Sequence, residues 1–280
     1  MKHKLLMEKR KRSLGKIESQ LLSVLSSRDK TIFTIEDAQN VTGTSPVATR
    51  LVLSDLVKKK WLIRLTSGKF LIVPFSAGQD GEHSENWYLI AKNLIEPFSY
   101  YISYYSALEI NEITIQPVFK IYISTPIRRQ PKKILGATYQ FIYIQEKDIW
   151  GIEDVWVTQS QKVKVSDIER TIIDCLNRPE FCGGISEIAK GIWIKRNNID
   201  YQKIVKYLKQ FNRKSVAKRL GLIFETYGIG EGKILSEIKK LISHSYALLD
   251  PTLENSGRFL DSWKLRLNIN PDELVDITKT

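Results

Sequence analysis

The sequence contains only two cysteines, Cys175 and Cys182, among its 280 residues. Because there is no second pair and no histidine near them, they predict neither a disulfide framework nor a zinc site, and we expect no metal or other cofactor. The three histidines, His3, His83 and His244, are far apart in the sequence. No pair of a nucleophile and a histidine base can be argued from them.

The sequence also lacks a run of about 18 consecutive apolar residues, which predicts that no helix crosses a membrane. Residues 1–12 are basic, but no apolar segment typical of a secretory signal follows them. We therefore expect a cytoplasmic protein with no membrane partner. Internal repeats and low-complexity segments are absent as well, and a hydrophobic content of 42% is enough to bury a core in one large or two smaller domains.

Positive charge is concentrated at one end of the sequence. Residues 1–77 contain fifteen Lys and Arg against six Asp and Glu, a net charge of +9, which leaves +3 of the total of +12 for the remaining residues. A basic segment joined to a segment with nearly equal numbers of positive and negative side chains is typical of a module that binds phosphate groups. A solvated basic face or a membrane-surface arm would have the same charge, so the residue pattern has to decide.

The pattern of residues 1–77 predicts two short helices. Apolar residues recur with the helical period over Lys16–Leu25, which indicates a helix with one buried stripe. Thr34, followed three residues later by Asp37, is typical of the start of a second helix that runs through Val41. Gly43 is then expected to end this helix, because glycine readily adopts a left-handed backbone conformation.

A third helix is predicted over Pro46–Lys60, with Ser45 as its N-cap. The face that packs on the earlier helices should be formed by Ala48, Val52 and Leu56, with Leu51 beside them. The opposite face should carry Val47, Arg50 and Ser54, flanked by Thr49. Two strand-like runs, Trp61–Leu65 and Phe70–Pro74, follow this helix and enclose a Ser-Gly turn, which predicts a β-hairpin.

The order helix, helix, turn, helix and hairpin predicts a winged helix-turn-helix over residues 1–77 that binds double-stranded DNA. In this interpretation the third helix enters the major groove through Ser45, Thr49, Arg50 and Ser54, with Arg50 against a guanine edge. Phosphate contacts are expected from the end of the helices and from the hairpin, or wing, through Thr44, Lys58, Lys59, Lys60, Arg64, Ser67 and Lys69.

A polar stretch over residues 78–86 predicts a linker to a second domain, residues 87–280. This domain should be strand-rich over residues 87–166 and mainly helical over residues 167–280, so the predicted fold class is α+β. Expected helices include Trp87–Leu94 and Tyr100–Ile110. Strands are expected at Val118–Ile123, Tyr139–Ile144, Val155–Val157, Val163–Val165 and Lys264–Ile269. Glycine breaks are expected at Gly183-Gly184, Gly221 and Gly228–Gly232.

The block Val163–Leu176 (VKVSDIERTIIDCL) continues into Arg178-Pro179-Glu180 and Gly183-Gly184. It resembles the AbiEi-type antitoxin and transcriptional regulator family of bacteria and archaea and is the most specific part of that resemblance. Further similar blocks are Tyr101–Leu108, Arg219-Leu220-Gly221, Trp263–Asn268 and Lys59-Lys60-Trp61-Leu62. In the last block, Lys60 stands where the family usually has glycine.

The resemblance implies a repressor that binds inverted repeats in its own promoter and regulates a toxin–antitoxin operon. It also implies that the larger domain acts as the antitoxin to a nucleotidyltransferase-like toxin, without a stable complex. No enzymatic activity and no catalytic residue is expected. The operon and the toxin partner rest on the resemblance alone, because fold does not determine function.

The Val163–Leu176 block also has a purely structural interpretation. Ser166 or Asp167 can cap the following helix, Glu169 is favoured in its first turn, and Arg170 can pair with Asp174 four residues later. Ile168, Ile172, Ile173 and Leu176 should then be buried.

Two other classes of function remain open at this point. A metal-dependent nuclease would need clustered carboxylates with a nearby lysine, and Glu153, Asp154, Lys162 and Lys164 flank strand-like segments. A winged helix can also serve as a non-catalytic protein-interaction module. The glycines over Gly228–Gly232 lack the spacing of a phosphate-binding loop and are better explained as a turn between helices.

Overall fold

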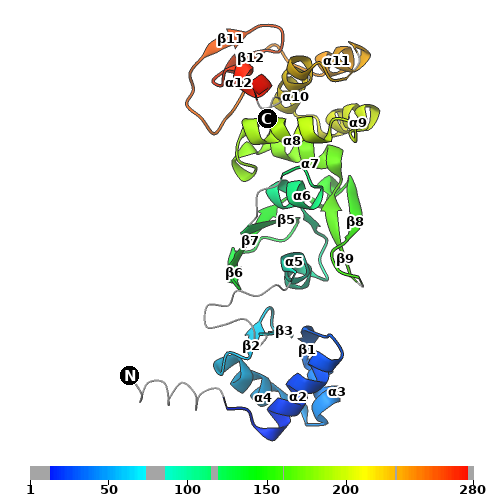
Figure 1. Cartoon of the computed structure of the whole chain (residues 1–280), viewed down its shortest axis with the longest axis vertical. Helices are drawn as coiled ribbons and strands as arrows, with labels where there is room; N and C mark the ends of the chain where they lie inside the picture. Colours follow the sequence, from blue (N-terminus) through cyan, green and yellow to red (C-terminus); the bar gives the residue numbers. More distant parts are fainter. Residues whose placement is uncertain (1–12, 74–85, 115–118, 160, 231, 277–280) are drawn as a thin grey trace. The chain divides into compact units, whose positions relative to one another are not determined.

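The computed structural model describes residues 13–73, 86–114, 119–159, 161–230 and 232–276 (Figure 1). The chain divides into two compact units, residues 1–96 with 134–136 and residues 97–133 with 137–280. Most of the predicted linker, residues 78–85, lies outside the described residues, and the division between the units follows Glu96 instead. The fold class is α+β, as the sequence predicts. Among the described residues, no helix combines the length and the apolar character that a bilayer crossing needs.

The first unit begins with three helices and a small sheet. The elements in chain order are α2 (Lys16–Ser27), β1 (Ile32–Thr34), α3 (Ile35–Thr42), α4 (Pro46–Lys58), β2 (Leu62–Arg64), β3 (Lys69–Ile72) and α5 (Trp87–Ile95). The sheet has the order β1-β3-β2, with both pairings antiparallel. The predicted hairpin is therefore present as β2 and β3, while β1 is a third strand that the sequence did not reveal.

Local signals determine where the helices of this unit begin and end. Thr34 caps α3 and forms a reciprocal pair of hydrogen bonds with Asp37, so the predicted capping box is confirmed. Gly43 follows α3 in the left-handed conformation, with φ of 64°. Ser45 accepts the amide of Ala48, and the helix starts at Pro46 as predicted.

A hydrophobic core joins α2, α3, α4 and the sheet. Its most buried members come from all of these elements: Leu21, Leu25, Phe33, Ala38, Leu53, Leu56, Leu62 and Phe70. Phe33 and Phe70 stack across β1 and β3, with ring centroids 5.9 Å apart. Each of the three helices buries one apolar stripe in this core. The opposite face of each helix therefore remains exposed to solvent.

The second unit contains a mixed six-stranded sheet with the order β6-β7-β5-β4-β9-β8. Its strands are β4 (Tyr101–Ile102), β5 (Lys120–Thr125), β6 (Lys132–Ile134), β7 (Ala137–Tyr143), β8 (Ile152–Trp156) and β9 (Lys162–Ser166). The pairs β5–β7 and β4–β9 are parallel, whereas β4–β5 and β8–β9 are antiparallel. The strands predicted around residues 121, 141, 155 and 164 are thus confirmed.

The prediction of a single helix over Tyr100–Ile110 is wrong. The structure has strand β4 followed by α6 (Tyr104–Ile110). Ile102 pairs with Val165 in the interior of the sheet, and Ser103 keeps an extended backbone before the helix starts. Tertiary pairing therefore overrides the helical pattern of the aromatic residues.

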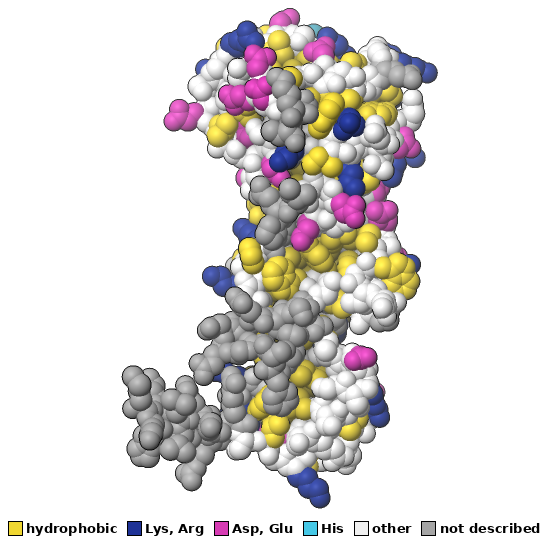
Figure 2. All heavy atoms as spheres, in the orientation of Figure 1, with side chains coloured by type: hydrophobic (Ala, Val, Ile, Leu, Met, Phe, Trp, Pro, Cys, Tyr) yellow, Lys and Arg dark blue, Asp and Glu magenta, His cyan; other side chains and the backbone are white. Residues whose placement is uncertain are grey.

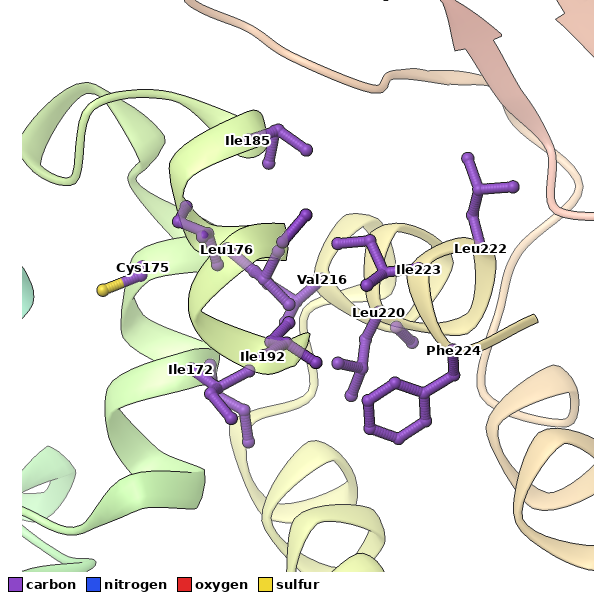
Figure 3. Close-up of a cluster of buried hydrophobic side chains, with 14 of the residues drawn as sticks. Ile172, Cys175, Leu176, Ile185, Ile192, Val216, Leu220, Leu222, Ile223 and Phe224 are labelled. Atoms are coloured by element: carbon purple, nitrogen blue, oxygen red, sulfur yellow. The ribbon is translucent and has the colours of Figure 1, made fainter. Parts of the chain in front are cut away.

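A helical region follows the sheet. It contains α7 (Ile168–Asn177), α8 (Ile185–Lys195), α9 (Tyr201–Phe211), α10 (Lys214–Tyr227), α11 (Gly232–Lys239) and α12 (Pro271–Asp276), with 3-10 turns at Glu146–Asp148 and Pro179–Phe181. A second sheet of order β10-β12-β11 is formed by β10 (Ala247–Leu248), β11 (Arg258–Leu260) and β12 (Leu265–Leu267). Figure 3 shows side chains of α7, α8 and α10 meeting in a common core.

Gly221 lies inside α10, so the prediction that it breaks a helix is wrong. A methyl group at this position would overlap the six-membered ring of Trp263, whose indole nitrogen donates to Glu225 at 2.7 Å. The neighbouring Arg219 is buried and donates to the carbonyl oxygens of Leu176 at 2.7 Å and Leu249 at 2.9 Å. Glycine is therefore required here for close packing rather than for backbone freedom.

Gly221→Ala should destabilise the second unit. The added methyl group must displace the buried Trp263 ring, which is expected to cost about 1–3 kcal/mol of the free energy of unfolding. Urea unfolding of the full-length protein measures this change. Gly232→Ala is the matched control, because nothing lies near a methyl group at this helical position. Equal stability of the two variants would contradict the packing role of Gly221.

Candidate nucleic-acid interface

The buried stripe of α4 differs from the predicted one. Thr49, Leu53 and Leu56 are buried, each with at most 1% of its surface exposed. Leu51, expected in the core, is 63% exposed instead. The helix is thus rotated by about one residue relative to the prediction, and a different set of side chains faces solvent.

The sequence predicts that Thr49 contacts a base, and the structure contradicts this prediction. Its side chain is fully buried, and its hydroxyl lies 2.8 Å from that of Thr44 and donates to the carbonyl oxygen of Ser45 at 3.0 Å. The Thr44 hydroxyl also lies 3.0 Å from that of Thr42. These hydroxyl groups satisfy one another across the turn between α3 and α4, so Thr49 holds the turn together and cannot reach a base.

The exposed face of α4 combines apolar, polar and cationic side chains. Arg50 is exposed and Ser54 half-buried, as expected for residues on this face. Val47 and Leu51, one helical turn apart, expose 67% and 63% of their surfaces. Sequence reasoning did not assign them a functional role, although their i, i+4 spacing outside the 49-53-56 stripe would have indicated a second apolar stripe.

The three consecutive lysines at the C-terminal end of α4, Lys58, Lys59 and Lys60, have three different roles. Lys58 is exposed and lies 3.3 Å from Asp55. Lys59 was predicted to contact phosphate, but it binds both carboxylate oxygens of Glu18 at 2.6 and 2.7 Å and joins α4 to α2. Lys60 is exposed and adopts a left-handed backbone with φ of 62°.

Lys60 occupies the position after the C-cap of α4. Its amide donates to the carbonyl oxygen of Val57, and the amide of Trp61 donates to that of Leu56, each at 3.0 Å. These two bonds form a Schellman motif, in which glycine is the usual residue at the position of Lys60. The turn before the hairpin is therefore retained although lysine replaces glycine.

The hairpin places further cations beside the helices. Arg64 ends β2 and its guanidinium lies 5.3 Å from the ring centroid of Phe70. Ser67 is exposed in the turn, and Lys69 starts β3, 3.9 Å from Glu96. Arg64 and Ser67 are thus exposed, whereas Lys69 is half-buried.

Three acidic side chains of the first unit, Glu18, Asp37 and Asp55, are bound by lysines. Besides the Glu18–Lys59 and Asp55–Lys58 pairs, Lys30 contacts Asp37 at 2.6 Å. Although partial burial alone would raise the pKa of Asp37, hydrogen bonds from Lys30 and Thr34 lower it. These pairs leave the positive potential of this unit to exposed cations such as Arg50 and Lys60.

In the second unit, two of the family-like blocks meet in a buried polar network. Arg170 donates to Asp174 at 2.9 Å, and both side chains are at most 3% exposed. Tyr101 donates to Asp174 and accepts from Arg170, each at 3.0 Å. Burial raises the pKa of Tyr101, so its hydroxyl stays protonated as the donor. The guanidinium of Arg170 also stacks on the ring of Trp150 at 3.9 Å.

The remaining carboxylates of the Val163–Leu176 block are engaged in the same way. Asp167 caps α7 by accepting the amide of Arg170 at 2.8 Å, and it also accepts from Tyr207 at 2.9 Å. Glu169 accepts the amide of Asp200 and pairs with Lys203, each at 2.8 Å. The predicted cap and the predicted ion pair are confirmed, and Ile172, Ile173 and Leu176 are buried while Ile168 is half-buried.

The network lies beside a pocket of about 310 Å³ in the second unit. Its lining includes Arg170, Asp174, Arg178 and Phe211. Arg178 pairs with Glu180 at 2.6 Å, so the arginines of this lining, except Arg213, already have carboxylate partners.

The carboxylates considered for metal-dependent cleavage lie on the β8–β9 hairpin. Asp154 faces Lys164 across the two strands at 3.8 Å, and both side chains are more than half exposed. Within the described part of the chain, no three His, Cys, Asp or Glu side chains are grouped so that they could hold a metal ion.

Comparison with known proteins identifies a fold but no family. No protein-family model matches the chain, and no curated protein matches it either. Among solved structures, the chain is similar to the crystal structure of the RV2827C protein from Mycobacterium tuberculosis, with a TM-score of 0.72. The two are 14% identical, and the match covers 96% of this chain and 97% of that one. At this identity the likeness shows a shared fold alone.

Lys60→Gly should stabilise the first unit and, if this unit binds DNA as the sequence predicts, should weaken that binding. Glycine adopts the left-handed backbone conformation at a cost about 1 kcal/mol lower than that of lysine, so the free energy of unfolding should rise by this amount. The substitution also removes an exposed cation. Urea unfolding and a DNA titration of the same variant measure the two effects. Lys58→Gly is the control, because glycine in the last turn of α4 should cost about 0.5–1 kcal/mol. A loss of stability in Lys60→Gly would contradict the role given to this turn.

Lys59→Ala should destabilise the first unit by about 1–2 kcal/mol, because it leaves the carboxylate of Glu18, which is only 9% exposed, without its cation. The neighbouring Lys58→Ala should change the free energy of unfolding by less than about 0.5 kcal/mol, since its pair with Asp55 is exposed. Thermal or urea unfolding of both variants separates the two roles. The assignment is wrong if Lys58→Ala is the more damaging substitution.

Proposed function

We propose that the protein is a sequence-specific DNA-binding transcriptional repressor whose first unit is a winged helix-turn-helix. In this proposal α3 and α4 form the helix-turn-helix, α4 enters the major groove, and the β2–β3 hairpin is the wing. The observation that carries the proposal is the exposed face of α4, where Arg50 and Lys58 flank side chains that can meet base edges.

Three features support this assignment. The turn between α3 and α4 is fixed by Gly43 and by the hydroxyl pair of Thr44 and Thr49, which gives α4 a defined orientation. The N-terminus of α4 is exposed, and its dipole favours a phosphate group. Arg64 and Ser67 are exposed on the hairpin, the element through which a wing contacts the DNA backbone.

We assign Arg50 to base recognition, with Ser54 beside it, and Lys58, Lys60, Arg64 and Ser67 to the phosphates. Lys59 and Thr49 are left out of the DNA contacts because their side chains are engaged inside the unit.

For the second unit we propose the antitoxin function of the family that the sequence resembles. The support is that its blocks meet in the structure: Tyr101 bonds with Arg170 and Asp174, and Gly221 packs on Trp263. These contacts explain the blocks as parts of a fold. The toxin partner and the autoregulated operon rest on the resemblance alone.

Arg50→Ala and Lys58→Ala should separate base recognition from phosphate binding. The test is a titration of the full-length protein with its own upstream DNA and with an unrelated duplex at two salt concentrations. Arg50→Ala should reduce the preference for the upstream DNA, because a bidentate contact to guanine contributes about 1–3 kcal/mol of discrimination. Lys58→Ala should weaken binding to both duplexes and lower the slope of log K against log salt by about one.

The wild-type protein provides the reference for both variants. It should prefer its upstream DNA by at least several hundred-fold. Equal, steeply salt-dependent binding to both duplexes would contradict a sequence-specific repressor. For the antitoxin function, co-expression with an adjacent nucleotidyltransferase-like protein should restore growth, and should still do so with Arg50→Ala, because that substitution leaves the second unit unchanged.

A further inference from the structure

Val47 and Leu51 form an apolar patch on the exposed face of α4. In the described part of the first unit they are the most exposed large hydrophobic residues, at 67% and 63%, followed by Ile17 on α2 at 42%. Single exposed apolar side chains are ordinary at protein surfaces. Two of them one turn apart, on the same face as Arg50, create a continuous apolar area that a partner can bury.

The positive charges that border the patch favour a polyanionic partner. Arg50 lies between the two residues in sequence, and Lys58 continues the same face toward the end of α4. The acidic side chain of this helix, Asp55, is bound by Lys58. An apolar area bordered by cations is complementary to a surface with negative charge at its edges and an apolar centre. The major groove of DNA is such a surface where it contains thymine, because phosphates line its edges and the thymine methyl group lies within it.

We propose that Val47 and Leu51 recognise the C5-methyl groups of thymines in the major groove. The methyl group is the apolar feature that distinguishes thymine on this edge of the base pairs. Four residues of an α-helix rise about 6 Å, and successive bases of one strand are about 3.4 Å apart. The two side chains therefore reach thymines about two steps apart, next to the base that Arg50 contacts. This inference rests on the proposed function, that α4 binds DNA.

The test changes the DNA and not the protein, so protein folding does not affect its outcome. A duplex is first enriched by the full-length protein from a random-sequence library. It is then synthesised again with deoxyuridine in place of each thymine in turn, which removes a methyl group and retains the hydrogen-bonding edge. At the contacted positions we expect about fourfold weaker binding per methyl group, which corresponds to about 0.8 kcal/mol.

Substitutions in the protein then assign each methyl group to a side chain. Val47→Ala and Leu51→Ala should each abolish the difference between thymine and deoxyuridine at one position. Ile17→Ala is the matched control, an exposed apolar residue on α2, and it should retain both differences. Sedimentation of the same variants reports whether the patch instead joins two copies of the chain.

The outcomes of these tests distinguish a failure of the inference from a failure of the proposed function. If the enriched duplex is bound equally well with deoxyuridine at every position, the thymine assignment is wrong, while sequence-specific binding stands. A change of oligomeric state in Val47→Ala or Leu51→Ala, without any change in thymine discrimination, would identify a second copy as the occupant and also overturn the inference. If the library yields no enriched sequence, the proposed function fails and the inference fails with it.

Discussion

The rotation of α4 about its own axis determines which of its side chains are exposed and therefore which DNA contacts we can propose, and the burial of Thr49 fixes that rotation. Thr49 lies in the same stripe as Leu53 and Leu56, and its hydroxyl is satisfied by Ser45 and Thr44. A buried hydroxyl without these partners would cost more than the stripe gains from burying it. The threonine contacts therefore hold the helix in the orientation that exposes Val47, Arg50 and Leu51.

Buried polar contacts have the same effect in the second unit. Arg170, Asp174 and Tyr101 satisfy one another in the core. Arg219 binds the carbonyl oxygens of Leu176, near the end of α7, and of Leu249, directly after β10. A buried ion pair contributes little net stability compared with an apolar core, but the loss of one partner is costly. Such groups restrict how the helices can pack, which accounts for their place in the blocks that resemble a family. They define the fold of the second unit.

Sequence reasoning succeeded where the determining interactions are local. Thr34, Gly43 and Ser45 act within a few residues of their own positions, so the ends of α3 and the start of α4 could be predicted. It failed where a distant partner decides. Lys59 binds Glu18, far away in the sequence, and Gly221 is inside a helix because Trp263 packs on it. The helical period predicts Thr49 at the edge of the exposed face, whereas its hydroxyl is satisfied by Thr44 and Ser45 inside the unit.

Site-specific photo-crosslinking tests whether the exposed face of α4 lies in the major groove, as we propose. A maleimide crosslinker is attached to Leu51→Cys or, as a control, to Ile17→Cys in the full-length protein. The native Cys175 and Cys182 are fully buried and remain unlabelled. Each labelled protein is irradiated on its enriched duplex, and the crosslinked nucleotide is mapped. We predict crosslinks from position 51 to bases within the binding site and none from position 17. Crosslinks from position 17 without any from position 51 would contradict it.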